Sequence, residues 1–108
     1  MSKINFIPMK EVKVFVQREN LGYVFDLLDT LETTNYVIVP SISDKSDYGY
    51  HVSNLMTNSE ENLVMLLTVM PEEKLEAFVT GLNPIFEKVP GGILIFDVMA
   101  VRNNNSLK

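Results

Sequence analysis

The sequence predicts one α+β domain in which strands and helices follow the order βαββαβ. Three observations support this prediction: apolar residues alternate in one segment, recur at helical spacing in two others, and run almost without interruption through a fourth. The chain has 108 residues, of which 46% are hydrophobic, so it can form one modest core but has no room for a second domain. We therefore treat residues 1–108 as a single domain.

The first strand is expected to begin at Val12. Residues 12–17 alternate, with three valines on one face and Lys13, Phe15 and Gln17 on the other. Residues 1–10 are expected to be a lead-in to this strand. Their apolar side chains could pack against another surface, such as a neighbouring subunit, and these side chains are Ile4, Phe6 and Ile7.

The first helix is expected after Asn20, which can cap a helix start. Apolar residues then recur at helical spacing, at Leu21, Val24, Phe25, Leu28 and Leu31. Residues 32–35 read as its exit turn. A second strand, Tyr36–Val39, is rich in β-branched and aromatic residues and is expected to end at Pro40.

The second half of the chain repeats this alternation of strand and helix. A third strand is expected at Leu63–Met70, and a helix opens at Pro71 with two acidic residues in its first turn. Gly81 and Pro84 are expected to weaken or kink the end of that helix. Pro90-Gly91-Gly92 is a tight turn into a fourth strand over residues 93–101, and residues 103–108 are expected to form a frayed tail.

This order is the split βαβ arrangement of ferredoxin-like folds, with both helices on one sheet face. The opposite face also needs cover, because Phe15 and the apolar run at 63–70 supply more apolar surface than one layer hides. The expected cover is another copy of the sheet.

Composition excludes several classes of function. The net charge is −5 and the basic residues are dispersed, which disfavours a nucleic-acid partner. The chain has no cysteine, so disulfides and thiol catalysis are excluded. The N-terminus does not resemble a signal peptide and no apolar run could span a bilayer, so a cytoplasmic location is expected.

Residues 41–61 show no secondary-structure pattern, and a loop this long in a compact domain is typical of a functional segment. It holds Tyr48, Tyr50 and the only histidine, His51, which are expected to contact a partner. A single histidine without a second His or Cys is a poor metal site, so no metal is expected. No nucleophile with a recognisable base is present, so the chain is not expected to be an enzyme.

Taken together, three motifs resemble the nitrogen-regulatory PII superfamily, and in particular its divergent PII-like branch. They are the long loop between the middle strands, the Val69-Met70-Pro71-Glu72-Glu73 helix start, and Pro90-Gly91-Gly92 followed by Ile93-Leu-Ile-Phe96-Asp97-Val98. The resemblance covers roughly residues 11–102. It implies a homotrimer that binds a small effector between subunits and regulates a target protein, such as a transporter or enzyme, through the long loop.

The resemblance also implies a set of ligand-binding residues, and here the chain departs from better-known members of the superfamily. The implied set is Asn35, Val37, Gly91, Gly92 and Arg102. Those members have a lysine where Gly92 stands and two arginines where Asn103 and Asn105 stand. With Arg102 as the one nearby cation, the expected ligand is AMP, ADP or a small anion rather than ATP.

Two other readings of the same residues stay open. The chain could be another non-enzymatic ferredoxin-like module, such as an ACT-like amino-acid sensor or a CutA-like trimer. An ACT-like site would lie at the turn between the first strand and the first helix. A small enzyme with a site assembled between subunits is a weaker third reading.

Overall fold

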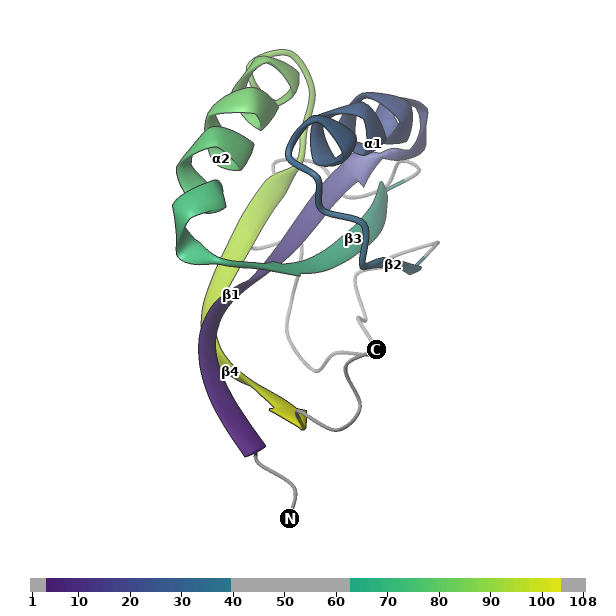
Figure 1. Ribbon diagram of the computed structural model, residues 1–108. Coiled ribbons are helices and arrows are strands. Elements are labelled where there is room, and N and C mark those ends of the chain that lie inside the picture. The colour runs from purple at the N-terminus through teal and green to yellow at the C-terminus, as the bar shows by residue number, and fades with distance from the viewer. Residues whose placement is uncertain (1–3, 40–62, 104–108) are drawn as a thin grey trace.

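The computed structural model describes residues 4–39 and 63–103, and the strands form one antiparallel sheet in the order β2-β3-β1-β4 (Figure 1). Both helices lie on the same face of this sheet. The architecture confirms the predicted α+β fold with ferredoxin-like order. In chain order the elements are β1 (Ile4–Gln17), a 3-10 turn η1 (Arg18–Asn20), α1 (Leu21–Thr30), β2 (Tyr36–Val39), β3 (Leu63–Met70), α2 (Glu72–Phe86) and β4 (Gly92–Asn103).

The prediction of a lead-in is wrong for residues 4–10, and the prediction of a frayed tail is wrong at Asn103. Residues 4–10 are part of β1 rather than a lead-in, because β4 continues alongside them as far as Asn103, opposite Ile4. Asn103 therefore belongs to β4 rather than to a frayed tail, and residues 104–108 lie outside the described residues. Pro8 is tolerated inside β1 because β3 ends opposite Lys10, so among the described residues no strand pairs with that side of β1 at the proline.

One rung of the sheet connects all four strands at the end where β4 begins. Val39 of β2 pairs with Met65 of β3, Met65 pairs with Phe15 of β1, and Phe15 pairs with Gly92 of β4. Val39 is the last residue of β2, and β3 begins two residues before Met65. The turn before β4 and the two ends of residues 40–62 therefore lie at the same end of the sheet.

The main core lies between the sheet and the helices. The valines predicted to share one face of β1 are fully buried there, together with apolar side chains of β3 and of both helices. The buried members are Val12, Val14, Val16, Val24, Leu28, Val64, Leu66, Met70, Phe78, Leu82 and Ile85. This cluster confirms the predicted alternation of β1 and the predicted stripes of the two helices.

The opposite sheet face carries a second, smaller apolar cluster of Phe15, Leu63 and Met65. Phe15 is fully buried within one chain, so the expectation that a second copy is needed to bury it is wrong. The large apolar side chains that stay exposed on this face, among the described residues, are Val37 at 58% and Phe96 at 39%. Lys13 lies beside Phe96, with its Nζ 4.9 Å from the ring centroid.

The ends of α1 are built by backbone geometry. The prediction that the Asn20 side chain caps α1 is wrong, since that side chain makes no capping hydrogen bond. The turn η1 leads directly into α1, so Asn20 has φ −97° and ψ 2° instead of the extended backbone typical of a capping residue. At the other end, the Glu32 N–H donates to the Asp29 carbonyl and the Thr33 N–H to the Leu28 carbonyl, both at 2.9 Å. This pair of bonds is a Schellman motif, and Glu32 occupies its left-handed position at φ 57°.

Replacing Glu32 by glycine should raise the free energy of unfolding by about 0.5–1 kcal/mol. A left-handed conformation costs a side-chain-bearing residue about 1–2 kcal/mol, and the greater freedom of unfolded glycine offsets part of this gain. Urea unfolding followed by circular dichroism measures the change. Glu32→Ala is the control, since it removes the carboxylate but keeps the Cβ. An equal gain in Glu32→Ala would assign the effect to charge at the helix end instead.

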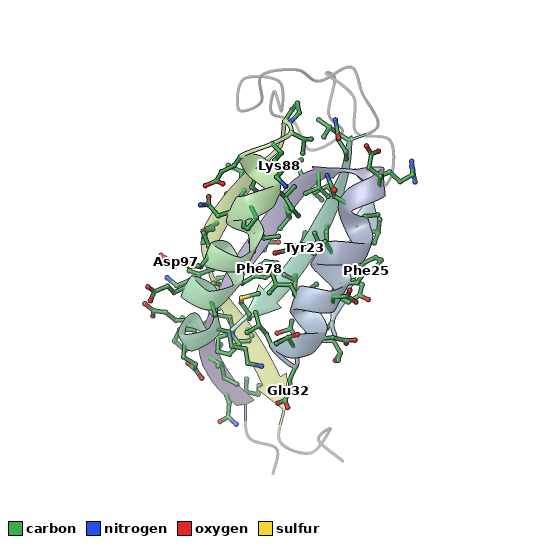
Figure 2. All side chains as sticks on the ribbon, turned by 90° about the horizontal axis from the view of Figure 1, so that it is seen from above. Tyr23, Phe25, Glu32, Phe78, Lys88 and Asp97 are labelled. Carbon is green, nitrogen blue, oxygen red and sulfur yellow. The ribbon has the colours of Figure 1, made fainter. Side chains whose placement is uncertain are left out.

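Helix α2 continues past both residues that were expected to weaken it, and ends at Phe86. Pro84 has no N–H to donate back along the helix. One turn earlier, the Gly81 carbonyl accepts a hydrogen bond of 2.8 Å from the Tyr23 hydroxyl of α1. Tyr23 lies between the two helices (Figure 2), and its bond to the backbone near Pro84 joins them.

Candidate functional site

The turn before β4 is shaped by close backbone approach. After α2, the Lys88 and Val89 N–H groups both donate to the Ile85 carbonyl, at 3.0 and 3.1 Å, which tightens the chain before Pro90. A Cβ on Gly91 would lie 2.4 Å from the Phe86 ring and 2.5 Å from the Phe15 carbonyl oxygen. Packing alone therefore requires glycine at position 91, whether or not its backbone N–H also binds a ligand.

Two of the predicted ligand residues lie at β2, on the opposite edge of the sheet. The Asn35 carbonyl accepts a hydrogen bond of 3.0 Å from Thr68 Oγ1, which fixes the chain just before β2. Val37 lies on the face away from the helices and is exposed. Strands β3 and β1 separate β2 from β4, so this edge lies about 14 Å from the strand that begins at Gly92.

Arg102 lies at the far end of β4, where its backbone pairs with Asn5. At about 3.3 Å per residue, the strand between Gly92 and Arg102 spans roughly 33 Å. One chain therefore brings Gly91 and Gly92 together but places Arg102 far from them. The loop residues Tyr48, Tyr50 and His51 lie outside the described residues.

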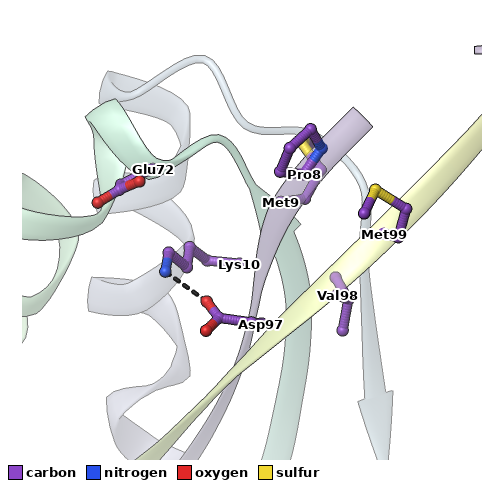
Figure 3. A pocket seen from close by; sticks show the side chains of 7 residues that line it. All are labelled: Pro8, Met9, Lys10, Glu72, Asp97, Val98 and Met99. Carbon is purple, nitrogen blue, oxygen red and sulfur yellow. Dashed lines mark hydrogen bonds and ion pairs between the residues drawn. The ribbon is translucent and has the colours of Figure 1, made fainter. Parts of the chain in front are cut away.

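A cavity of about 290 Å³ lies beside the first turn of α2 (Figure 3). It is lined by Pro8, Met9, Lys10, Glu72, Asp97, Val98 and Met99. Lys10 forms an ion pair with Asp97 of β4. The hydrogen bond within this ion pair, from Lys10 Nζ to Asp97, raises the pKa of Lys10 above its usual value. The nearby Glu72 carboxylate also raises this pKa. With two carboxylates and one cation, this cavity does not favour a phosphate ligand.

A second cavity of about 240 Å³ lies between the start of α1 and the end of α2. It is lined by three polar residues and three apolar ones, namely Asn20, Tyr23, Lys88, Pro84, Ile85 and Val89. Sequence reasoning did not single out Lys88, although its position two residues before the Pro90 turn was a usable signal. This cation lies near Gly91 in the chain, which makes it the natural comparison for Arg102.

Within residues 4–39 and 63–103, no group of His, Asp and Glu side chains could hold a metal ion. In the same part of the chain, no helix has the length and apolar character needed to cross a membrane.

The backbone resembles several solved structures. The apo form of CPII, a nitrogen regulatory PII-like protein from Thiomonas intermedia K12, gives a TM-score of 0.76 at 24% sequence identity, and the match covers 93% of this chain and 99% of that one. CPII bound to ADP and bicarbonate gives 0.72 at 26% identity, covering 91% and 93%. A PII-like signalling protein from Thermus thermophilus gives 0.67 at 16% identity, covering 89% and 91%.

No protein-family model matches the sequence, and no curated protein matches it. The structural matches nevertheless span nearly the whole chain and nearly the whole of each solved protein. The chain is therefore a divergent protein of the PII-like fold, as the sequence predicted.

Proposed function

We propose that this protein is a PII-like regulatory trimer that binds a small effector between subunits and controls a target protein, such as a transporter or enzyme. The observation that carries the proposal is the separation of Gly91 and Gly92 from Arg102 along β4, roughly 33 Å at strand spacing. These residues can contact one ligand only if they come from two copies of the chain. The loop with Tyr48, Tyr50 and His51 would contact the target.

The chemistry of the proposed cleft favours a ligand with few phosphates. Backbone N–H groups at the Gly91-Gly92 turn can hold one phosphate, and Arg102 can make one further bidentate contact. The chain already carries a net charge of −5, so each added phosphate needs a cation to offset its desolvation. The effector is therefore AMP, ADP or a small anion. In support, CPII was solved with ADP, AMP and bicarbonate bound.

The test is isothermal calorimetry with AMP, ADP, ATP and bicarbonate, with and without Mg²⁺. We expect AMP or ADP to bind more tightly than ATP. Arg102→Ala should weaken nucleotide binding by about ten- to a hundredfold, the loss expected when one charge-assisted contact is removed. Lys88→Ala is the matched control, because it removes one cation outside the proposed set of ligand residues and should leave nucleotide affinity unchanged. Tighter binding of ATP would contradict the proposal.

A second candidate function is supported by the cavity at the start of α1. An ACT-like sensor would bind its amino acid near this turn, where Asn20, Tyr23 and Lys88 line about 240 Å³. A free amino acid could pair its carboxylate with Lys88. In that case calorimetry would show binding of an amino acid and not of a nucleotide. Lys88→Ala would abolish the heat of amino-acid binding, and Arg102→Ala would not.

A further inference from the structure

The second cavity, between the start of α1 and the end of α2, is formed within one chain. The two helices run in opposite directions, so Asn20 before α1 and Lys88 after α2 lie at the same end of the helix layer (Figure 2). The lining of this cavity includes none of the residues implied to bind the effector, which are Asn35, Val37, Gly91, Gly92 and Arg102. The cavity is therefore separate from the proposed cleft, whatever that cleft binds.

Two polar side chains of the lining have no partner among the described residues. The Lys88 ammonium group makes no hydrogen bond or ion pair in that part of the chain. The carboxylate next to it in sequence, that of Glu87, instead accepts a hydrogen bond of 3.3 Å from Asn83 Nδ2. The Asn20 amide does not bond to the start of α1, nor to any other described residue. One cation and one amide are therefore available to a ligand.

The charge around this cavity is positive. Among the described residues, its lining contains no Asp or Glu, whereas in the other cavity Lys10 is paired with Asp97. Helix α1 has no acidic residue in its first turn, and Glu19 of the preceding turn η1 does not line the cavity. A lysine without a carboxylate partner and the positive end of a helix both attract a negative group. Since the chain carries a net charge of −5, one lysine suits a ligand with a single negative charge.

The apolar part of the lining determines the rest of the ligand. Pro84, Ile85 and Val89 supply surface for a short hydrocarbon tail, and burial of such a tail is favourable. The volume of about 240 Å³ is below the roughly 300–1,000 Å³ of sites for drug-sized ligands, so the ligand has few atoms. An ammonium group on the ligand would meet no carboxylate in this lining, and an unpaired charge is costly to desolvate. The lining therefore favours a simple carboxylate over a zwitterionic amino acid.

We propose that this cavity binds a small monocarboxylate with a short apolar tail. The carboxylate pairs with the Lys88 ammonium group and accepts a hydrogen bond from the Asn20 amide. The tail lies against Pro84, Ile85 and Val89, which belong to the end of α2 and the segment after it. A ligand held in this way joins the start of α1 to the end of α2 and gives the protein a second binding site in each chain.

The first test is an NMR titration of the isotope-labelled full chain with isocaproate at constant ionic strength. We expect the backbone amide signals of Asn20, Tyr23, Lys88 and Val89 to shift and to saturate by about 10 mM, since ligands of so few atoms bind weakly. Isohexanol, which lacks the charge, and acetate, which lacks the tail, should each bind at least about tenfold more weakly. Leucine is isocaproate with an added amino group, and tighter binding of leucine would overturn the proposed class of ligand. Shifts that do not saturate would overturn the site.

The second test assigns the charge contact to one lysine. Lys88→Met keeps the length of the side chain but removes its charge, and it should weaken isocaproate binding by about tenfold or more. Lys88→Arg keeps the charge and should bind isocaproate nearly as well as the wild type. Lys74→Met is the matched control, because Lys74 lies on the same helix but donates to the Glu32 carbonyl and does not line the cavity. Far-UV circular dichroism shows that the variants remain folded. Unchanged affinity in Lys88→Met, or an equal loss in Lys74→Met, would refute the proposal.

Discussion

Replacing Phe78 by alanine should lower the free energy of unfolding by about 3–5 kcal/mol. Phe78 is fully buried between α2 and the sheet, within the main core (Figure 2). Truncation removes the largest buried side chain of α2 and leaves a cavity that the close-packed neighbours cannot fill. Urea unfolding measures the loss. All variants are compared at one protein concentration, because the stability of an oligomer depends on it.

Since a loss of this size can exceed the stability of a small domain, Phe78→Leu provides a second measurement. It keeps most of the apolar volume and should cost about 1–2 kcal/mol, less than the alanine variant. Glu76→Ala is the surface control on the same helix and should change stability by no more than about 0.5 kcal/mol. Equal losses in Phe78→Ala and Glu76→Ala would mean that Phe78 is not a core residue.

Gly91→Ala should be more damaging than alanine at Gly22 or Gly81, at a cost of about 1–3 kcal/mol or more. The added Cβ would meet the Phe86 ring at 2.4 Å and the Phe15 carbonyl oxygen at 2.5 Å. The ring can turn aside, but the Phe15 carbonyl cannot, because Phe15 is paired with Gly92 in the sheet. Adding Phe86→Leu to Gly91→Ala should therefore recover only part of the lost stability.

The matched control is Gly22→Ala. Apart from its own helix turn, a Cβ on Gly22 would meet no atom of the described residues within 4 Å, and the residue lies in the first turn of α1. Alanine there should stabilise the protein by up to about 1 kcal/mol, through helix propensity. If Gly91→Ala were as well tolerated as Gly22→Ala, the contacts with Phe86 and Phe15 would not fix the turn. Those contacts would then give no reason for the backbone conformation proposed to bind phosphate.

The sequence predicted the sheet and helices well where local pattern and packing agree. The bounds of β2 and β3 match the prediction, since both segments are short apolar runs ended by turn residues. The start of β1 could not be predicted from alternation, because Pro8 and Lys10 interrupt the apolar pattern and the strand is sustained only by pairing with β4. That pairing is a property of two segments about ninety residues apart along the chain.

The candidate site was predictable only in part, for a related reason. The resemblance implied that Gly91 and Gly92 bind the ligand. The structure adds that position 91 must be glycine because a Cβ there would clash with the Phe86 ring. The predicted strand over residues 93–101 already put Arg102 at the end opposite Gly91, and β4 of the structure places it there. Lys88 was overlooked because its cavity is formed by two helices that only the fold brings together.

The rung from Val39 through Met65 and Phe15 to Gly92 has a mechanical consequence. Backbone pairing couples the positions of residues in neighbouring strands. A ligand that fixes the turn before Gly92 therefore constrains, through three successive pairings, the last residue of β2 and the start of β3. If the effector binds at this turn as proposed, the contact would act on Val39 and on the start of β3 through the sheet.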